Sequence, residues 1–264
     1  MMRERTTSAL ITGASSGIGA ALALRLAAPG AVLHLSGRDG ARLAQVAAAC
    51  RSRGAEVHQA VLDVRDAAAM AAWIQGAGRL DLVVANAGIS AGTADGVAES
   101  AAQTRAIFAT NLDGVLNTAL PAWEVMRGQA PGSDGVRGRI AVIASIAAFL
   151  AVPGAPCYCA SKAAVDAWAV GSAPAAARDG VRLTSVCPGY IRTPMTDRNR
   201  FPMPGLMDAD RAAALILRGV AAGRVRLVFP WWLGALARGT ALLPAPLVAR
   251  LAATQPGKEA AVSG

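Results

Sequence analysis

Residues 8–26 read SALITGASSGIGAALALRL, and their pattern indicates the fold class most directly. A short apolar run typical of a buried strand ends in a glycine-rich turn, and an Ala- and Leu-rich run typical of a helix follows directly. Gly13, Gly17 and Gly19 let the backbone turn tightly and approach a phosphate, which the free N–H groups of the new helix can bind. The spacing is G-x-x-x-G-x-G rather than G-x-G-x-x-G, and an ordinary strand-to-helix loop is the alternative. Because the turn follows the first strand, we expect it to bind a nucleotide.

The same alternation of apolar and Ala-rich runs continues along the chain. Candidate strands occupy residues 8–12, 31–36, 56–62, 80–85, 139–145, 182–187 and 226–229. Candidate helices lie near residues 17–28, 39–53, 66–76, 99–128, 157–179 and 208–222. Several strands are nearly continuous apolar runs, as expected for strands buried on both faces of a parallel sheet. The pattern predicts an α/β fold with a doubly wound parallel sheet of the Rossmann type, in a single domain spanning residues 1–264 with its core at 8–230.

Composition and charge narrow the possible partners. The formal net charge is +9, from 26 Lys and Arg against 17 Asp and Glu. The arginines are scattered and only 4% of residues are aromatic, so we expect no nucleic-acid binding. The four cysteines show no CxxC spacing, which predicts free thiols and no metal site. The N-terminal residues contain no apolar signal segment, so we expect a reducing, cytoplasmic location.

The second candidate strand ends in HLSGRD, residues 34–39, which bears on the choice of cofactor. An acidic side chain at the strand tip would accept hydrogen bonds from the 2′-hydroxyl of the adenine ribose in NAD, but Gly37 stands there and Arg38 follows. A guanidinium complements the 2′-phosphate of NADP. Asp39 is the competing acceptor for NAD, although its place directly before a helix suits an N-cap. We therefore expect NADP(H) to be preferred over NAD(H).

Two further strand ends carry candidate cofactor residues. Asp63 and Val64 follow the third strand, and the Asp63 carboxylate either accepts from the adenine amine or caps the following helix. Asn86, Ala87 and Gly88 follow the fourth strand, where small residues let the backbone pass close to a cofactor. The carboxyl ends of the strands form the edge at which open α/β sheets bind ligands.

Residues 158–162 read YCASK and contain one of the two tyrosines and one of the two lysines of the chain. At positions i and i+4 of a helix, Tyr158 and Lys162 share a face. A cation beside a phenol stabilises the phenolate, so we expect Lys162 to lower the pKa of Tyr158 and to make it a proton donor and acceptor for a carbonyl or an alcohol. The compact ammonium can also hold a ribose hydroxyl, which the planar fork of arginine would do less well. An ordinary pair on a helix surface is the alternative.

Two more polar residues accompany this pair. Ser145 ends the fifth candidate strand, where its hydroxyl could bond a substrate oxygen, and a turn serine is the alternative. Asn111 falls in the preceding candidate helix, beside the expected site, with a local backbone bond as the alternative. His34 and His58 lie inside candidate strands rather than at their ends, so a histidine base lacks a candidate.

The sequence resembles the short-chain dehydrogenase/reductase family from about residue 8 to residue 230. The motifs that carry the resemblance stand in the family's order: TGASSGIG (12–19), NAG (86–88), Asn111, Ser145, YCASK (158–162) and PGYIRTP (188–194). The resemblance implies an NAD(P)-dependent carbonyl reductase or alcohol dehydrogenase in which Tyr158 is the acid/base and Lys162 tunes it. It further implies that Ser145 holds the substrate oxygen and that Asn111 supports a water-linked proton path.

The resemblance also completes the expected site. It implies that Ile191 and Thr193 contact the nicotinamide carboxamide. The residues expected to bind the cofactor are Gly13, Ser15, Ser16, Gly17, Ile18, Gly19, Arg38, Asp63, Val64, Asn86, Ala87, Gly88, Tyr158, Lys162, Pro188, Gly189, Ile191 and Thr193. The expected catalytic residues are Asn111, Ser145, Tyr158 and Lys162.

One departure from the family concerns assembly. In the family, the helix that carries the tyrosine and lysine usually packs against its symmetry mate. Gly171 and Pro174 fall inside that helix here, and proline removes a helical hydrogen bond and kinks the axis. We expect a homodimer or homotetramer, with the usual helix interface in question.

The C-terminal third holds two apolar segments. Residues 190–210 are rich in methionine and aromatic groups, which favours a lid over an apolar ketone, with a packed loop as the alternative. Residues 229–264 form an extension that begins with Trp231 and Trp232 and is interrupted by prolines and an arginine, so it is no transmembrane span. We favour a packed lid or a subunit contact for this extension over peripheral membrane contact.

Together the motifs predict an NADP-dependent oxidoreductase that transfers hydride between the nicotinamide and a carbonyl or secondary alcohol of an apolar substrate. A nucleotide-sugar epimerase or dehydratase is one alternative, but it would need a larger C-terminal substrate region. A non-catalytic NADP-binding sensor or scaffold is another, but it would have no need for the full set of polar residues around Tyr158.

Overall fold

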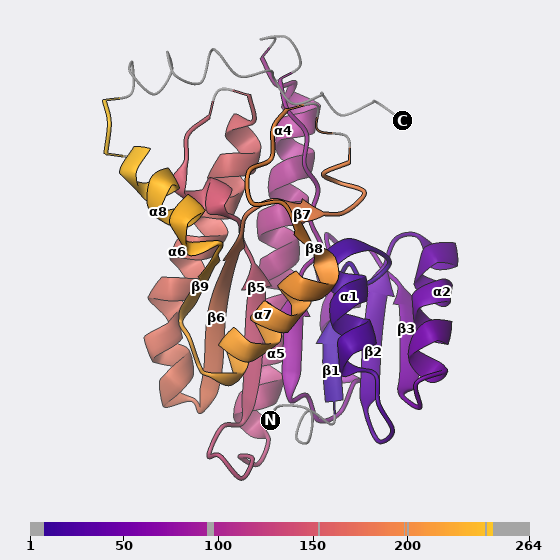
Figure 1. Ribbon diagram of the computed structural model, residues 1–264. Helices are drawn as coiled ribbons and strands as arrows, with labels where there is room; N and C mark the ends of the chain where they lie inside the picture. Colours follow the sequence, from indigo (N-terminus) through magenta and orange to yellow (C-terminus); the bar gives the residue numbers. More distant parts are fainter. Residues whose placement is uncertain are drawn as a thin grey trace.

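Seven parallel strands form a central sheet in the order β3-β2-β1-β4-β5-β6-β9 (Figure 1). The structure is a computed structural model, and the residues it describes are 8–93, 98–152, 154–197, 199, 201–240 and 242–244. The strands are β1 (Ser8–Ile11), β2 (Val32–Gly37), β3 (Glu56–Val61), β4 (Leu82–Ala85), β5 (Gly138–Ile143), β6 (Val181–Pro188) and β9 (Arg226–Phe229). The strand order reverses between β1 and β4, which both pair with their neighbours in parallel. In open α/β sheets such a reversal marks the crevice where ligands bind.

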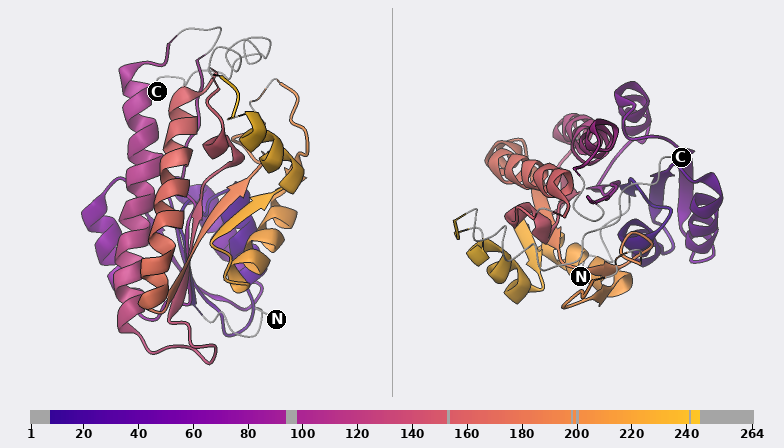
Figure 2. Two further views of the ribbon diagram at one scale, coloured as in Figure 1. Left: turned by 90° about the vertical axis from the view of Figure 1, so that its left-hand side faces the viewer. Right: turned by 90° about the horizontal axis from the view of Figure 1, so that it is seen from above.

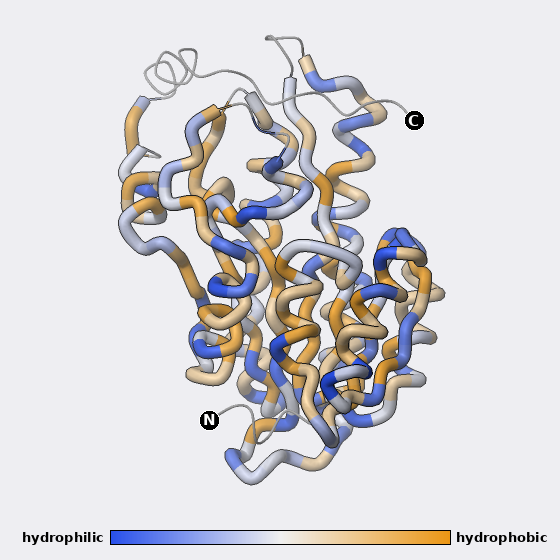
Figure 3. Tube along the Cα trace, turned by 45° about the vertical axis from the view of Figure 1, so that its right-hand side comes forward, coloured by the Kyte–Doolittle hydropathy of each residue, from blue (hydrophilic) through white to orange (hydrophobic). Residues whose placement is uncertain are grey.

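Helices cover both faces of the sheet (Figure 2). One face carries α1 (Gly17–Leu26), α2 (Gly40–Arg51) and α7 (Ala209–Ala221). The other carries α3 (Ala67–Gln75), α5 (Gly114–Gly128) and α6 (Pro156–Arg178), with α4 (Ala101–Phe108) packed on α6. Strand β1 shows why both faces are covered, because Ala9 and Ile11 pack into one core layer and Leu10 into the other. Hydrophobic stretches accordingly follow the strands, whereas hydrophilic residues recur on the outer turns of the helices (Figure 3).

The predicted strands and helices are confirmed, with their ends within two residues of the predicted positions. The long helix predicted at 99–128 consists of α4 and α5 joined by a π-helical turn, η2 (Ala109–Asp113). Helix α6 continues through Gly171 and Pro174, so the proline does not end it.

Four short elements were not predicted. They are the 3₁₀ turn η3 (Ile146–Phe149), the paired two-residue strands β7 (Ile191–Arg192) and β8 (Met207–Asp208), and helix α8 (Trp231–Thr240). The 3₁₀ turn and the two-residue strands contain too few residues for a periodic pattern to show, whereas α8 lies at the start of the segment that was interpreted as an apolar extension. Within the described residues, no helix is both long and apolar enough to cross a membrane. The part of the predicted C-terminal extension beyond residue 244 lies outside the described residues.

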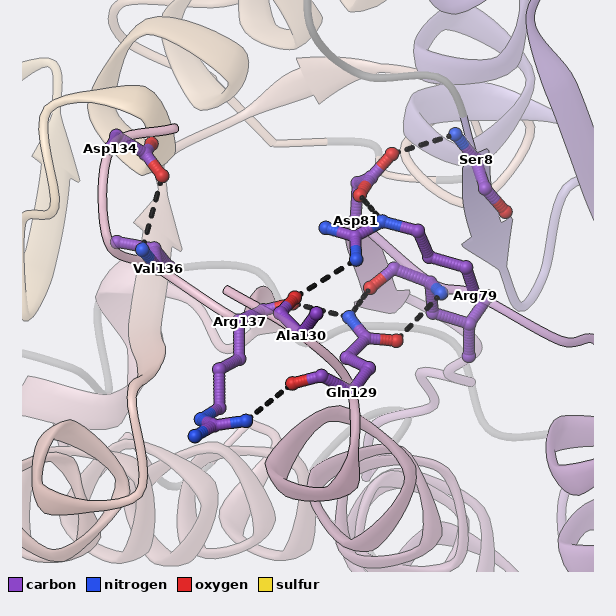
Figure 4. A network of polar contacts seen from close by, with 9 residues as sticks. Ser8, Arg79, Asp81, Gln129, Ala130, Asp134, Val136 and Arg137 are labelled. Carbon is purple, nitrogen blue, oxygen red and sulfur yellow. Dashed lines mark hydrogen bonds and ion pairs between the residues drawn. The ribbon is translucent and has the colours of Figure 1, made fainter. Parts of the chain in front are cut away.

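A polar network closes the amino edge of the sheet (Figure 4). Asp81, which stands just before β4, accepts from the N–H of Ser8 at 3.1 Å and from Nε of Arg79 at 2.9 Å. Gln129 accepts from the N–H of Leu80 at 3.2 Å and donates to the carbonyl of Leu80 at 2.7 Å. The backbone groups at this edge therefore find partners within the protein, and the opposite, carboxyl edge holds the large cleft described next.

Candidate functional site

A cleft of about 670 Å³ lies at the carboxyl edge of the sheet. Most of the predicted site residues line it: Gly13, Ser15, Ser16, Gly17, Ile18, Arg38, Asp63, Val64, Asn86, Ala87, Gly88, Ser145, Tyr158, Lys162, Pro188, Gly189, Ile191 and Thr193. Gly19 and Asn111 are not part of the lining. Segments that follow six different strands thus meet at one edge, which is where a parallel sheet brings them together.

The glycine turn has the geometry of an anion cradle. Gly13 and Gly17 have φ of +64° and +56°, a left-handed conformation that other residues rarely adopt. A Cβ at Gly17 would lie 2.9 Å from Cγ2 of Thr193, and a Cβ at Gly13 would lie 2.8 Å from Cα of Ala87. Ser16 stands at the N-cap of α1 without a side-chain hydrogen bond to the helix, and Ser16, Gly17 and Ile18 line the cleft, so the N-terminus of α1 lies where its N–H groups can bind an anion. These features fit the pyrophosphate of a dinucleotide.

Gly19 has a packing function instead. A Cβ at this position would collide with the carbonyl oxygen of Gly13 and would lie 2.7 Å from Nδ2 of Asn86. The absence of a side chain therefore lets α1 pack closely against the turn, which is the role of a third glycine in such motifs.

Asn86 joins β1 to β4 at the point where the strand order reverses. Its Nδ2 donates to the carbonyls of Thr12 and Gly13 at 3.0 and 3.1 Å. The hydroxyl of Thr12 in turn accepts from the N–H groups of Asn86 and Ala87 at 3.0 and 3.2 Å. Thr12 was not predicted as a site residue, although its place directly before Gly13 at the end of the first strand was a usable signal.

The end of β2 presents two guanidinium groups to the cleft. Arg38 is exposed and lines the cleft, as does Arg42 on the first turn of α2, which was not predicted. Asp39 caps α2 by accepting from the N–H of Arg42 at 2.9 Å, and its carboxylate also pairs with Nε of Arg42 at 2.6 Å. The N-cap interpretation of Asp39 is therefore confirmed. The hydrogen bonds from Arg42 lower the pKa of Asp39 and keep its carboxylate engaged.

Asp63 lies on the cleft wall and does not cap the helix that follows it. The cap of α3 is Asp66, whose side chain accepts from the N–H of Ala69 at 3.0 Å, so the cap alternative for Asp63 is wrong. The Asp63 carboxylate pairs with Nη2 of Arg65 at 2.6 Å and accepts from the N–H of Arg65 at 3.0 Å. These bonds lower the pKa of Asp63, so it is ionised at neutral pH.

Tyr158 and Lys162 lie one turn apart on α6, with Lys162 Nζ 5.9 Å from the centre of the Tyr158 ring. Burial raises the pKa of Tyr158 to about 12, and a hydrogen bond with Ser145 acts in the opposite direction. Burial also lowers the pKa of Lys162 to about 8, while its Nζ donates to the carbonyl of Ile143 at 2.8 Å. The expected net lowering of the Tyr158 pKa is therefore not found in this structure, where loss of hydration is the largest effect on the phenol.

Ser145 occupies the junction between β5 and η3. Its Oγ accepts from the N–H of Ala147 at 3.1 Å and so caps the 3₁₀ turn. The same side chain faces the cleft and hydrogen-bonds with Tyr158. The turn-serine interpretation is therefore confirmed, and the contact of Ser145 with a substrate oxygen stays a prediction that its position allows.

Asn111 connects two of the segments that form the site. It is fully buried in the π-helical turn η2, a feature that often occurs at functional sites. Its Oδ1 accepts from the N–H of Ile89 at 2.8 Å, and its Nδ2 donates to the carbonyl of Ile89 at 3.0 Å and to Oγ of Ser161 at 3.1 Å. The side chain thus ties the segment after β4 to the helix that carries Tyr158 and Lys162.

The cleft lining also contains residues that were not predicted: Ser90, Ala91, Gln103, Ala106, Ile107 and Thr110. Met195 and Thr196, from the predicted lid at 190–210, line the cleft as well. Gln103, Ile107 and Thr110 follow the i, i+4, i+7 spacing of one helix face, so the periodicity of the predicted helix could have found them. Neither histidine lines the cleft, and within the described residues no group of three or more His, Cys, Asp or Glu side chains could hold a metal ion.

The fold and this site define a Rossmann-type dinucleotide-binding enzyme. The chain belongs to the short-chain dehydrogenase family, whose model, described as short chain dehydrogenase, matches residues 7–202. An uncharacterised oxidoreductase of Myxococcus xanthus is 34% identical over 91% of this chain and 94% of its own length. Gluconate 5-dehydrogenase of Gluconobacter oxydans is 34% identical over 72% of this chain and 73% of its own length.

A solved structure of the same family has the same fold. A short-chain dehydrogenase/reductase from Burkholderia phymatum in complex with NAD has 26% sequence identity and a TM-score of 0.79, over 90% of this chain and 94% of that chain. The protein is therefore an NAD(P)-dependent dehydrogenase/reductase that acts on a small-molecule substrate and interconverts CH–OH and C=O groups.

Proposed function

We propose that the protein reduces the carbonyl of an apolar substrate, or oxidises the matching alcohol, with NADP(H) as cofactor and with Tyr158 moving the proton. The observation that carries this proposal is the convergence of Tyr158, Ser145 and Lys162 on the cleft that also holds the glycine turn. A phenol, a hydroxyl and an ammonium in this arrangement can handle an oxygen that gains and loses a proton.

The side chains divide the chemistry among them. When bound, the nicotinamide cofactor supplies or accepts the hydride. Burial keeps Tyr158 neutral, so in the reduction direction it has a proton to donate to the substrate oxygen. Ser145, hydrogen-bonded to Tyr158, holds the same oxygen. Lys162, fixed by the carbonyl of Ile143, stabilises the tyrosinate that remains and binds the ribose hydroxyls.

The preference for NADP(H) rests on charge. Arg38 and Arg42 both line the cleft where the adenine ribose would lie, and Gly37 offers no acidic side chain there. The carboxylate of Asp39 already caps α2 and pairs with Arg42, and that of Asp63 pairs with Arg65. Two guanidinium groups beside carboxylates that are already engaged suit a 2′-phosphate better than a 2′-hydroxyl. The solved relative that holds NAD shows a nicotinamide dinucleotide in this fold and does not decide between the two cofactors in this chain.

The apolar character of the substrate rests on the residues of this chain alone. Ile89, Ala91, Ala106, Ile107 and Met195 contribute apolar groups to the cleft lining. Gln103 and Thr110 add polar groups to the same lining, which suits a carbonyl compound with an apolar body. The name of the relative gluconate 5-dehydrogenase concerns a polar substrate, so substrate class is assigned here from the lining and not from that name.

Assembly and location complete the proposal. We propose a homo-oligomer, supported by the exposed apolar side chains of α8, where Trp231 is 78% exposed and Leu236 is 59% exposed. A reducing compartment, such as the cytoplasm, is supported by the four free cysteines, three of which are buried.

The test replaces each tyrosine in turn. Tyr158→Phe removes only the proton donor, so ketone reduction followed by NADPH absorbance should fall by about a thousandfold or more, while the Kd of NADPH stays within about twofold. Tyr190→Phe, the other tyrosine change, should retain most of the turnover, because Tyr190 is absent from the cleft lining and packs edge-on to Phe201 with ring centres 6.0 Å apart. A panel of ketones and aldehydes graded by polarity gives the substrate class. Substantial turnover by Tyr158→Phe would contradict the catalytic assignment, and a preference for polar substrates would contradict the apolar one.

A further inference from the structure

Two guanidinium groups from different elements lie close to the ring of Phe149. Cζ of Arg238, on α8, is 4.2 Å from the ring centre, and Cζ of Arg226, on β9, is 5.8 Å from it. Both distances fall within the range at which a cation is attracted to the face of an aromatic ring. Phe149 is the last residue of η3, the turn that begins immediately after Ser145.

The second of these arginines is held in place by the helix that carries the proton donor. Arg226 forms a two-pronged pair with Asp166, with Nε to Oδ1 at 2.9 Å and Nη2 to Oδ2 at 2.7 Å. Asp166 is buried and also accepts from Oγ of Ser185 at 2.7 Å. It stands on α6 one turn beyond Lys162. A continuous path therefore runs from α6 through Asp166 and Arg226 to the Phe149 ring.

Helix α8 adds the other half of this arrangement. It packs on β9, where Gly234 leaves room for the side chain of Val228, and on η3. Arg238 is the charged residue of α8, and its guanidinium lies over the Phe149 ring. The ring thus contacts one arginine that is fixed to α6 and another that belongs to α8.

We propose that Arg238 is a positioning residue for Ser145, acting through the Phe149 ring. The inference rests on the proposed function of Ser145 and Tyr158. The 3₁₀ turn spans only Ile146–Phe149, so a displacement of the ring at its end moves the backbone that carries Ser145 at its start. The contact with Arg226 fixes the position of η3 relative to α6, and the contact with Arg238 holds η3 in that position. The C-terminal helix, which contributes no residue to the cleft lining, thus acts on the hydrogen bond between Ser145 and Tyr158.

The test measures catalysis, cofactor binding and the pH profile of Arg238→Met, which keeps the length of the side chain and removes its charge. We expect kcat for ketone reduction to fall roughly fivefold to thirtyfold, while the Kd of NADPH stays within about twofold. Because the bond with Ser145 lowers the pKa of Tyr158, its loosening should move the alkaline limb of the kcat profile to higher pH. The other ionisable groups that face Tyr158 are Lys162 and Cys159 on its own helix and Tyr190 after β6, and none of them is altered.

Two further variants separate positioning from general loss of structure. Arg238→Lys keeps a cation over the ring and should restore most of kcat and the parental pH limb. Phe149→Leu removes the ring, and in that background Arg238→Met should cause no further loss. Arg218→Met, an exposed arginine on α7, is the matched control and should behave as the parent.

Two results would overturn the inference, and they differ from the result that would contradict the proposed function. A parental kcat and pH profile in Arg238→Met, or an undiminished effect of this change in the Phe149→Leu background, would overturn the inference. If Arg238→Met does not fold, the alkaline limb of the kcat profile can still be measured in Arg238→Lys and Phe149→Leu. An alkaline limb at the same pH as in the parent would then contradict the inference if Phe149→Leu shows it. Failure of the proposed function would appear instead as activity retained in Tyr158→Phe.

Discussion

Replacement of Asn111 by alanine should destabilise the protein more than any simple loss of side-chain volume would suggest. The side chain is fully buried and makes three hydrogen bonds, at 2.8 and 3.0 Å to the backbone of Ile89 and at 3.1 Å to Ser161. A hydrogen bond typically contributes about 1 kcal/mol net, so the three predict a loss of about 3 kcal/mol. Ile89 is only half-buried, so entering water should keep the loss near this value rather than at the full cost of unsatisfied buried groups.

The assay is equilibrium unfolding in urea followed by tryptophan fluorescence. The midpoint should fall with an unchanged slope, because the surface exposed on unfolding stays the same. Asn117→Ala provides the matched control, since Asn117 makes one recorded bond, to the carbonyl of Val64 at 2.9 Å, and should cost about 1 kcal/mol. Equal losses in the two variants would refute the reasoning. Normal stability combined with lost turnover would mean that Asn111 serves the proton path alone.

Three further predictions follow from charge and exposure. Arg38→Ala should raise the Kd of NADPH tenfold or more, corresponding to about 1.5–3 kcal/mol for a charge-assisted contact, with little effect on NADH; equal losses in fluorescence titrations with both cofactors would exclude a role in reading the 2′-phosphate. Because burial lowers the pKa of Lys162 to about 8, the free energy of unfolding should decline as the pH falls from about 10 through 8, and Lys162→Met should lack this component in urea titrations at stepped pH. Trp231, which is 78% exposed, should lie in a subunit contact, so Trp231→Asp should shift the species in sedimentation velocity toward the monomer; an unchanged mass together with vesicle binding by the parent would favour a membrane contact instead.

The long elements of the fold could be predicted from the sequence because their patterns repeat. Strands such as β1 are apolar on both faces, and helices such as α6 are long enough for a propensity signal to persist across Pro174. The capping role of Asp39 followed from its place before a helix, and the structure confirms it. The grouping of strand ends at one edge followed from the parallel topology.

What the sequence concealed depends on contacts between distant residues. The balance of burial and charge that sets the pKa of Tyr158 arises from elements far apart in the chain, and local spacing to Lys162 gave the wrong direction. The π-helical turn that holds Asn111 is invisible to a helical pattern, because the pattern on either side is continuous. The packing of Arg238 on Phe149 joins α8 to η3, and neither element was predicted from the sequence pattern.

The bond between Asn86 and Thr12 has a consequence for how this enzyme could acquire new substrates. It ties the end of β1 to the segment after β4 at the crevice, so the glycine turn and this segment keep their relative position beside the cofactor site. The walls contributed by α4 and by the segment around Met195 are separate, later stretches of chain. Exchange of these two stretches between relatives should therefore transfer substrate choice while the glycine turn, Tyr158 and Lys162 stay in place.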